Sequence, residues 1–303
     1  MKRLVLIDGH AILHRAFHAF PSSLTTRKGE QVNAVYGFTR MLLGVIADLH
    51  PKYLAVAFDR PEPTFRHKEF IGYQVQRPKM EAELKNQIGR VHQVVEALNI
   101  PIFEKAGFEA DDMIGTLSCQ AAAKKIQTII VSGDRDLMQL VGRNTKIYLP
   151  QKGFTEARLC GEPEVKEILG IKPSQVIDYK ALVGDSSDNY PGVSGIGPKT
   201  AVLLLQQYQN LEKIYQNLDK IKPLVAEKLK KGKESALLSQ KLATILLRAP
   251  AKLNLKACRV ADYDREKIIR LFEELEFKSL INKLPGAELE KKTKPKNQQI
   301  KLI

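Results

Sequence analysis

The chain has 303 residues and a formal net charge of +14 at pH 7, with 48 lysines and arginines against 34 acidic residues. No apolar stretch is long enough for a membrane span, and the N-terminal apolar run is too short for a signal peptide. The cysteines lack the spacing of a zinc site or a disulfide framework. We expect a cytoplasmic globular protein whose basic excess faces nucleic acid or another anionic surface, although a solvated lysine-rich surface would give the same charge.

The first half of the chain alternates between short apolar runs and amphipathic stretches. Strands are predicted at 3–7, 53–58, 127–132 and 145–149, and helices at about 33–49, 80–98 and 110–125. Continuous apolar strands separated by helices are typical of a parallel sheet that is covered on both faces. The sequence therefore predicts an α/β domain over residues 1–174, with a central, mostly parallel sheet flanked by helices.

From about residue 160 the pattern changes to helices and turns. Helices are predicted at 163–169, 173–183, 199–208, 211–217, 223–230, 234–246 and 264–275. We predict a second, helical subdomain over residues 175–286. Residues 287–303 are rich in lysine and lack apolar periodicity, so they are predicted to form a basic disordered tail.

Aspartates follow three of the predicted strands at the point where each strand ends. These residues are Asp8, Asp59 and Asp134. Ligands of open parallel sheets lie beyond the carboxyl ends of the strands, so we expect the three carboxylates to meet at one edge. Other acidic clusters lie at Glu109, Asp111, Asp112, Asp136, Asp185 and Asp188. Oxygen ligands without histidine or cysteine favour Mg²⁺ or Mn²⁺, and two such ions about 4 Å apart can drive displacement at phosphorus.

Each of these signals also has a plainer interpretation. The acids at 109–112 begin a predicted helix, where the helix dipole alone favours negative charge. The glycines of residues 192–197 precede Lys199 and Thr200 at a helix start. They could hold a phosphate on exposed backbone amides, or could form a tight turn between helices. The basic stretch from Arg60 to Arg90, with interleaved aromatic residues, fits single-stranded DNA or a solvated helical face.

The motifs together resemble the 5′-nuclease (flap endonuclease) family, and within it the N-terminal 5′–3′ exonuclease domain of bacterial DNA polymerase I. The resemblance runs from Leu4 to about Leu284 and depends on nine segments in this order. These segments are Ile-Asp-Gly-His (7–10), Arg-Ala-Phe-His (15–18), Ala-Val-Tyr-Gly-Phe (34–38), Phe-Asp (58–59), Thr-Phe-Arg-His (64–67), Glu-Ala-Asp-Asp (109–112), Gly-Asp-Arg-Asp (133–136), Gly-Asp-Ser-Ser-Asp-Asn (184–189) and the glycine hairpin.

The resemblance implies a structure-specific nuclease that uses two divalent ions. It implies metal ligands at Asp8, Asp59, Glu109, Asp111, Asp112, Asp134, Asp136, Asp185 and Asp188. It implies catalytic roles for Asp8, Asp112, Asp134, Arg77 and the position of Gln74. It implies DNA contacts from Arg15, Arg66, Tyr73, Arg77, Gly192, Gly195, Gly197, Lys199 and Thr200.

The resemblance also implies an architecture and a setting. A helical arch over about 65–100 would admit single-stranded 5′ ends, and a helix–hairpin–helix at about 185–207 would grip duplex DNA and hold K⁺. The expected reaction is hydrolysis of DNA, or primer RNA, near 5′ flaps, nicks and ends, in primer removal and repair. The expected cofactor is Mg²⁺, with Mn²⁺ as a substitute. The protein is expected to act as a nucleoid-associated monomer, with a DNA polymerase as a partner.

Two features depart from the family. The arch of the family carries Tyr-Lys-x-x-Arg, whereas this chain reads Tyr73-Gln74-Val75-Gln76-Arg77, so a neutral glutamine replaces a lysine. This departure supports an alternative, a DNA-junction-binding protein with weak catalysis. A related ribonuclease of the same α/β type is a third hypothesis. The chain also ends where the polymerase would continue with further domains, so it is either a free-standing nuclease or a piece of a longer protein.

Overall fold

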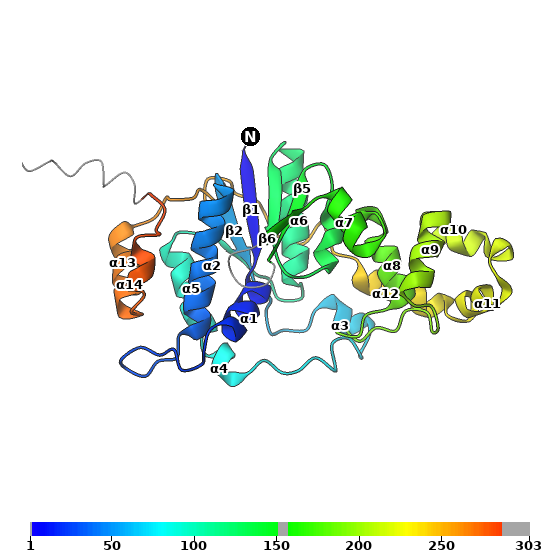
Figure 1. The fold of residues 1–303 in the computed structure, drawn as a ribbon, viewed down its shortest axis with the longest axis horizontal. Coiled ribbons are helices and arrows are strands. Elements are labelled where there is room, and N and C mark those ends of the chain that lie inside the picture. The colour runs from blue at the N-terminus through cyan, green and yellow to red at the C-terminus, as the bar shows by residue number, and fades with distance from the viewer. Residues whose placement is uncertain (1, 151–156, 287–303) are drawn as a thin grey trace, which may run out of the picture.

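The computed structural model describes residues 2–150 and 157–286 and contains one six-stranded sheet (Figure 1). The strands are β1 (Arg3–Asp8), β2 (Tyr53–Ala57), β3 (Ile102–Phe103), β4 (Gln127–Val131), β5 (Thr145–Pro150) and β6 (Ala157–Cys160). Their order is β3-β2-β1-β4-β5-β6, and all neighbours are parallel except β5 and β6. The sheet therefore confirms the predicted α/β fold with a mostly parallel centre.

Helices cover both faces of the sheet. Val5 and Ile7 of β1 pack into one hydrophobic cluster, whereas Leu4 and Leu6 pack into the other, because successive side chains of a strand point to opposite faces. The first cluster includes residues of α1 (Gly9–Ala19), α2 (Asn33–Leu49), α5 (Ile88–Ala97) and α13 (Arg265–Glu274). The second includes residues of α6 (Ala110–Ala123). Burial on both faces explains why the central strands are apolar at almost every position.

The helical part extends away from the sheet toward the right of Figure 1. Its helices are α7 (Glu162–Leu169), α8 (Val176–Val183), α9 (Pro198–Tyr208), α10 (Leu211–Gln216), α11 (Pro223–Lys231) and α12 (Lys233–Ala243). Short 3₁₀ turns lie at Asp136–Leu140 (η1), Pro173–Gln175 (η2) and Leu218–Lys220 (η3). The chain then returns to the other end of the molecule, where α13 and α14 (Lys278–Ile281) lie beside α5.

The prediction was wrong in a few local places. The helix predicted at 80–98 is two helices, α4 (Ala82–Lys85) and α5, and Gln87, which lies between them, contacts the start of α2. Its Oε1 accepts hydrogen bonds from the backbone N–H groups of Ala34 and Val35. The helices α1 and α14 and the strands β3 and β6 were not predicted.

The C-terminal tail and the absence of a membrane span were also predicted from the sequence. The predicted tail at 287–303 lies outside the described residues. Within the described part of the chain, none of the helices has both the length and the apolar character that a bilayer crossing requires.

Candidate metal and DNA site

The three aspartates that follow strands lie at one edge of the sheet, because β2, β1 and β4 are neighbours. Asp8 is the last residue of β1 and is 6% exposed. It also caps α1, since its Oδ1 accepts a hydrogen bond from the N–H of Ala11 at 3.1 Å. Asp59 and Asp134 come two and three residues after the ends of β2 and β4. Asp8, Asp59 and Asp134 therefore lie at one edge of the sheet in the folded chain, as the strand ends predicted.

Ser132 connects two of these aspartates, and the sequence analysis did not identify it. Its hydroxyl donates to Asp8 Oδ2 at 2.7 Å and accepts the N–H of Asp134 at 2.9 Å. Ser132 is fully buried, so this connection is shielded from water. The only sequence signal was its position directly after a buried strand, beside Asp134.

The start of α6 supplies a second set of carboxylates. Asp59 Oδ1 accepts the N–H of Ala110 at 2.7 Å, and Asp59 itself is held by His10, whose Nδ1 accepts the N–H of Asp59 at 3.1 Å. Glu109 is the N-cap residue of α6, and burial raises its pKa to about 7. The plainer interpretation of 109–112 as a helix start is thus also correct, since the side chains of Glu109 and Asp112 form a capping box at the start of α6.

Asp111 is the electrostatic centre of this group. Burial raises the pKa of its carboxyl well above the usual value, and the charges of Asp134, Asp8, Asp59 and Glu109 raise it further. Among the described residues, no hydrogen bond or ion pair reaches its carboxylate. Burial likewise raises the pKa of Asp8 to about 7, with contributions from Asp59 and Asp134. These mutual effects place Asp8, Asp59, Glu109, Asp111 and Asp134 in one electrostatic neighbourhood.

A second, outer group follows along the edge toward the helical part. Asp134 Oδ1 accepts the N–H of Asp136, the first residue of η1, at 2.8 Å. Burial raises the pKa of Asp136 to about 7, and the charge of Asp134 contributes. Asp185 lies in the loop after α8, where its Oδ1 accepts the N–H groups of Ser187 and Asp188. Asp134 joins the two groups, because its pKa is raised by burial and by the charges of Asp188 and Asp185.

The donor set fits Mg²⁺ or Mn²⁺, although the cage is not preformed. Over residues 2–150 and 157–286, no three His, Cys, Asp or Glu side chains lie close enough together to hold an ion by themselves. Mg²⁺ keeps several waters and is commonly bound through one or two carboxylates and substrate phosphates, so it does not need an all-protein cage. Repelling carboxylates without cationic partners, such as Asp111, are the groups that such an ion would neutralise.

Asp112 and Arg66 lie elsewhere than expected. Asp112 is 0% exposed. Its Oδ2 and Oδ1 accept hydrogen bonds from Nη1 and Nη2 of Arg66, each at 2.9 Å. Its oxygens also accept the N–H groups of Glu109 and Leu246. Arg66 is 2% exposed and donates further to the carbonyls of Leu242 and Thr244. In this structure Asp112 has no free oxygen for an ion and Arg66 has no surface for DNA, because each satisfies the other inside the protein.

The segment predicted as an arch begins with α3 (Phe65–Glu69) and runs below α1 and the sheet to α4 (Figure 1). Gln74 does not stand free in it. Its Nε2 donates to Asp188 Oδ1 at 2.9 Å, and its backbone N–H donates to the carbonyl of Asp188. Asn189 Nδ2 donates to the carbonyl of Gly72 at 2.7 Å. Gln74, at the position where the resemblance leads us to expect a lysine, therefore fastens this segment to the loop of Asp185 and Asp188.

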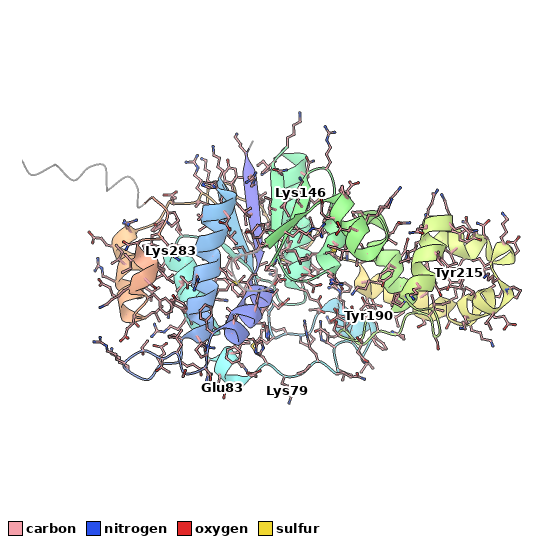
Figure 2. All side chains as sticks on the ribbon, viewed as in Figure 1. Lys79, Glu83, Lys146, Tyr190, Tyr215 and Lys283 are labelled. Atoms are coloured by element: carbon pink, nitrogen blue, oxygen red, sulfur yellow. The ribbon has the colours of Figure 1, made fainter. Side chains whose placement is uncertain are left out.

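Of the other residues of this segment that are predicted to contact DNA, Arg77 is exposed and Tyr73 is buried. Arg77 is exposed, as are Lys68 and Lys79, and Lys79 lies at the lower margin of the molecule in Figure 2. Tyr73 is 3% exposed, and its hydroxyl donates to Asp188 Oδ2 at 3.2 Å, so in this conformation it positions a carboxylate and does not face outward. Arg15 lies half-buried on α1.

The glycine hairpin is held from inside and exposed at its tip. Val193 and Ile196 are buried, whereas Gly195, Gly197 and Lys199 are exposed, and Thr200 is half-buried. Gly197 precedes α9, and a side chain built there would meet open space, so its backbone is accessible to a ligand. Gly192 is buried instead, with its N–H and carbonyl bonded to the hydroxyls of two serines of α12. Its φ of 61° and its contact with Gly184 require glycine, so Gly192 shapes the turn.

Comparisons with known families cover nearly all of the chain. The family described as "5'-3' exonuclease, N-terminal resolvase-like domain" matches residues 3–170, and "5'-3' exonuclease, C-terminal SAM fold" matches residues 171–266. DNA polymerase I of Caldicellulosiruptor bescii is 43% identical over 289 residues, which is 95% of this chain and 34% of that protein. DNA polymerase I of Bacillus subtilis is 39% identical over 93% of this chain and 32% of its own length. The chain thus spans about a third of these relatives.

Solved structures of similar fold are more distant in sequence. The bacteriophage T5 flap endonuclease, in a pseudo-enzyme-product complex with DNA and metal ions, has a TM-score of 0.66 at 19% identity, over 95% of this chain and all of that one. The catalytic core of Rad2 in complex with a DNA substrate has a TM-score of 0.57 at 14% identity, over 90% of this chain and 87% of that one. At these identities the likeness establishes the fold.

Proposed function

Because the chain belongs to the 5′–3′ exonuclease family, we propose that it hydrolyses phosphodiesters of DNA, and of primer RNA, near 5′ flaps, nicks and ends. The observation that supports this proposal best is the acidic edge, where carboxylates that follow three neighbouring strands and that begin α6 outnumber the cationic side chains paired with them in the described part of the chain. The proposed setting is primer removal and repair at the bacterial nucleoid, beside a DNA polymerase and as a monomer.

The proposed site uses the described carboxylates in two groups. Asp8, Asp59, Glu109 and Asp111 form the inner group, and Asp134, Asp136, Asp185 and Asp188 form the outer group. Two Mg²⁺ ions, or Mn²⁺ in their place, would supply a water of lowered pKa and would stabilise the leaving oxygen. The chain itself fixes the carboxylates, through Ser132 for the inner group and through Gln74 and Tyr73 for Asp188.

The remaining residues position DNA in this proposal. The exposed backbone of Gly195 and Gly197, with Lys199 and Thr200, would hold phosphates of the duplex without reading bases. Arg77 would meet a phosphate of the single-stranded 5′ end. The hairpin carbonyls are the proposed K⁺ ligands, but the carbonyl of Gly195 already accepts Lys228 Nζ at 3.2 Å, so K⁺ there would compete with that lysine.

A single assay distinguishes this function from its alternatives. We expect the protein to cleave a 5′-flap DNA near the junction in Mg²⁺, and to bind but not cleave it in EDTA. Tight binding without cleavage in Mg²⁺ would favour the DNA-junction-binding protein. Faster cleavage of single-stranded RNA than of the flap would favour the ribonuclease. Single-turnover cleavage is the measurement, with both substrates labelled at the 5′ end.

Gln74→Lys should raise single-turnover cleavage of the flap. Gln74 now donates one neutral hydrogen bond to Asp188, whereas a lysine would bring a charge that binds a phosphate more strongly. The expected gain is about tenfold, which corresponds to about 1.4 kcal/mol in the barrier. Gln76→Lys is a suitable control, because Gln76 is exposed in the same segment and gains the same charge. An equal gain in both variants would mean that only the net charge of the segment matters.

A further inference from the structure

Lys180 places an ammonium group among the outer carboxylates. Its Nζ lies 2.5 Å from Asp136 Oδ1 and also pairs with Asp185 Oδ2. The three residues come from α8, from η1 and from the loop that follows α8. The side chains of Lys180, Asp136 and Asp185 are only 17%, 18% and 11% exposed, so water screens these pairs weakly.

The ammonium group of Lys180 is held by two ion pairs. Asp136 belongs to η1 and Asp185 to the loop after α8, so carboxylates from two separate segments hold the ammonium group. The inner group differs, because no lysine or arginine is found paired with Asp8 or Asp111 in the described part of the chain. Within the inner group Glu109 shares Arg66 with Asp112, at 3.2 Å from Arg66 Nη1. The two groups therefore start from different states: Asp8 and Asp111 have no such cation beside them among the described residues, whereas the Asp136–Asp185 pair already holds one.

We propose that Lys180 is a tethered counter-cation that occupies the Asp136–Asp185 pair until a divalent ion binds there and displaces it. This inference rests on the proposed function, which assigns these carboxylates to an ion. An ion at the outer group must separate two ion pairs, whereas an ion at the inner group relieves repulsion. Lys180 therefore weakens the outer ion relative to the inner one, and it holds η1 and the loop of Asp185 together while no ion is bound.

The direct test is Mn²⁺ binding to the whole chain without DNA, measured by electron paramagnetic resonance of free Mn²⁺. Wild-type protein should show one tighter and one weaker class of site. Lys180→Met should tighten the weaker class about tenfold and leave the other unchanged, a change of about 1.4 kcal/mol in binding. Lys166→Met is the matched control, because Lys166 is exposed on α7 and loses the same charge. Lys180→Arg, which keeps the cation, should bind as wild type does.

Thermal unfolding gives a second measurement that does not depend on activity. In EDTA, Lys180→Met should melt at a lower temperature than wild type, because Asp136 and Asp185 are left unneutralised. Saturating Mn²⁺ should raise its melting temperature by more than it raises that of the wild type. If Lys180→Met fails to fold in EDTA, the milder Lys180→Gln is measured in the same way.

Two outcomes separate this inference from the proposed function. Mn²⁺ binding that is unchanged or weaker in Lys180→Met and Lys180→Gln, in a wild-type protein that binds Mn²⁺ and cleaves flaps, would overturn the inference alone. A wild-type protein that neither binds Mn²⁺ nor cleaves flaps would overturn the proposed function.

Discussion

Asp111→Asn should lower the rate of flap cleavage by about a thousandfold while DNA binding in EDTA remains. The side chain keeps its size but loses the charge that the proposed inner ion requires, and metal stabilisation of a transition state is worth several kcal/mol, or roughly 4 kcal/mol for a factor of a thousand. The same variant should be more stable than wild type in EDTA. Removing one of the carboxylates lowers the charge repulsion within the folded state. Each kcal/mol that is added to the free energy of unfolding raises the melting temperature by about 2–4 °C.

The stability of the metal-free protein should also depend on pH with a defined sign. Burial raises the pKa of Asp8 to about 7, whereas an unfolded aspartate titrates near about 4. A raised pKa means that the folded state holds its proton more tightly. Its contribution to stability is therefore complete below about pH 4 and is lost as the pH rises through about 7. Asp111 shifts in the same direction, so Asp111→Asn should reduce this loss.

Melting curves in EDTA at pH 5 and pH 8, beside cleavage rates in Mg²⁺, test both statements. Asp219→Asn is the matched control, because Asp219 is exposed in η3 and loses the same charge. Equal melting temperatures of wild type and Asp111→Asn in EDTA at pH 8 would contradict the repulsion on which the proposed site depends. Undiminished cleavage would remove Asp111 from the site.

The sequence was sufficient to predict the acidic edge, because the end of a strand can be recognised from the residues next to it. Asp8, Asp59 and Asp134 each follow an apolar run, and parallel strands place such residues at one edge whatever their order. The link through Ser132 could not be predicted, because it requires β1 and β4 to be neighbours. Strand order is set by packing of the whole domain and not by the residues near the bond.

Helix phase explains why Asp112 lies in a different environment from Asp111. Adjacent residues of a helix point about 100° apart, so Asp111 and Asp112 cannot face the same space. The sequence placed both at the helix start but did not say which of them faces the metal edge. The structure turns Asp112 inward to Arg66, whereas no side chain of residues 2–150 or 157–286 forms a hydrogen bond or ion pair with the carboxylate of Asp111. A buried arginine at position 66 was not detectable either, since a basic stretch with aromatic residues is equally typical of a DNA-binding face.

Tertiary contacts also decide the roles of Gln74 and Lys180. The family pattern identified Gln74 as unusual, but its bond to Asp188 joins residues that lie 114 positions apart. Nothing in the sequence distinguishes Lys180, since a single lysine in a short helix is ordinary. Its ammonium becomes notable only when η1 and the loop after α8 bring two carboxylates to it.

Arg66→Met should destabilise the protein by about 3–5 kcal/mol, the usual loss when one partner of a buried ion pair is removed. Asp112 would remain 0% exposed with its charge uncompensated, and the carbonyls of Leu242 and Thr244 would lose their donors. The bonds of Arg66 join the first helix of the arch segment to α6 and to the C-terminal end of α12. Loosening this junction should therefore also slow flap cleavage.

Urea unfolding of the whole chain at pH 7 measures the effect. Arg158→Met is the matched control, because Arg158 also pairs with a carboxylate, Glu167, but the two side chains are 37% and 66% exposed. Exposed pairs contribute about 0–1 kcal/mol, so this control should change little. The double variant Arg66→Met with Asp112→Asn should recover part of the loss, because no unpaired charge then remains buried. Equal small losses in Arg66→Met and Arg158→Met would mean that Asp112 finds another partner or water, and that the arch segment is held by other contacts.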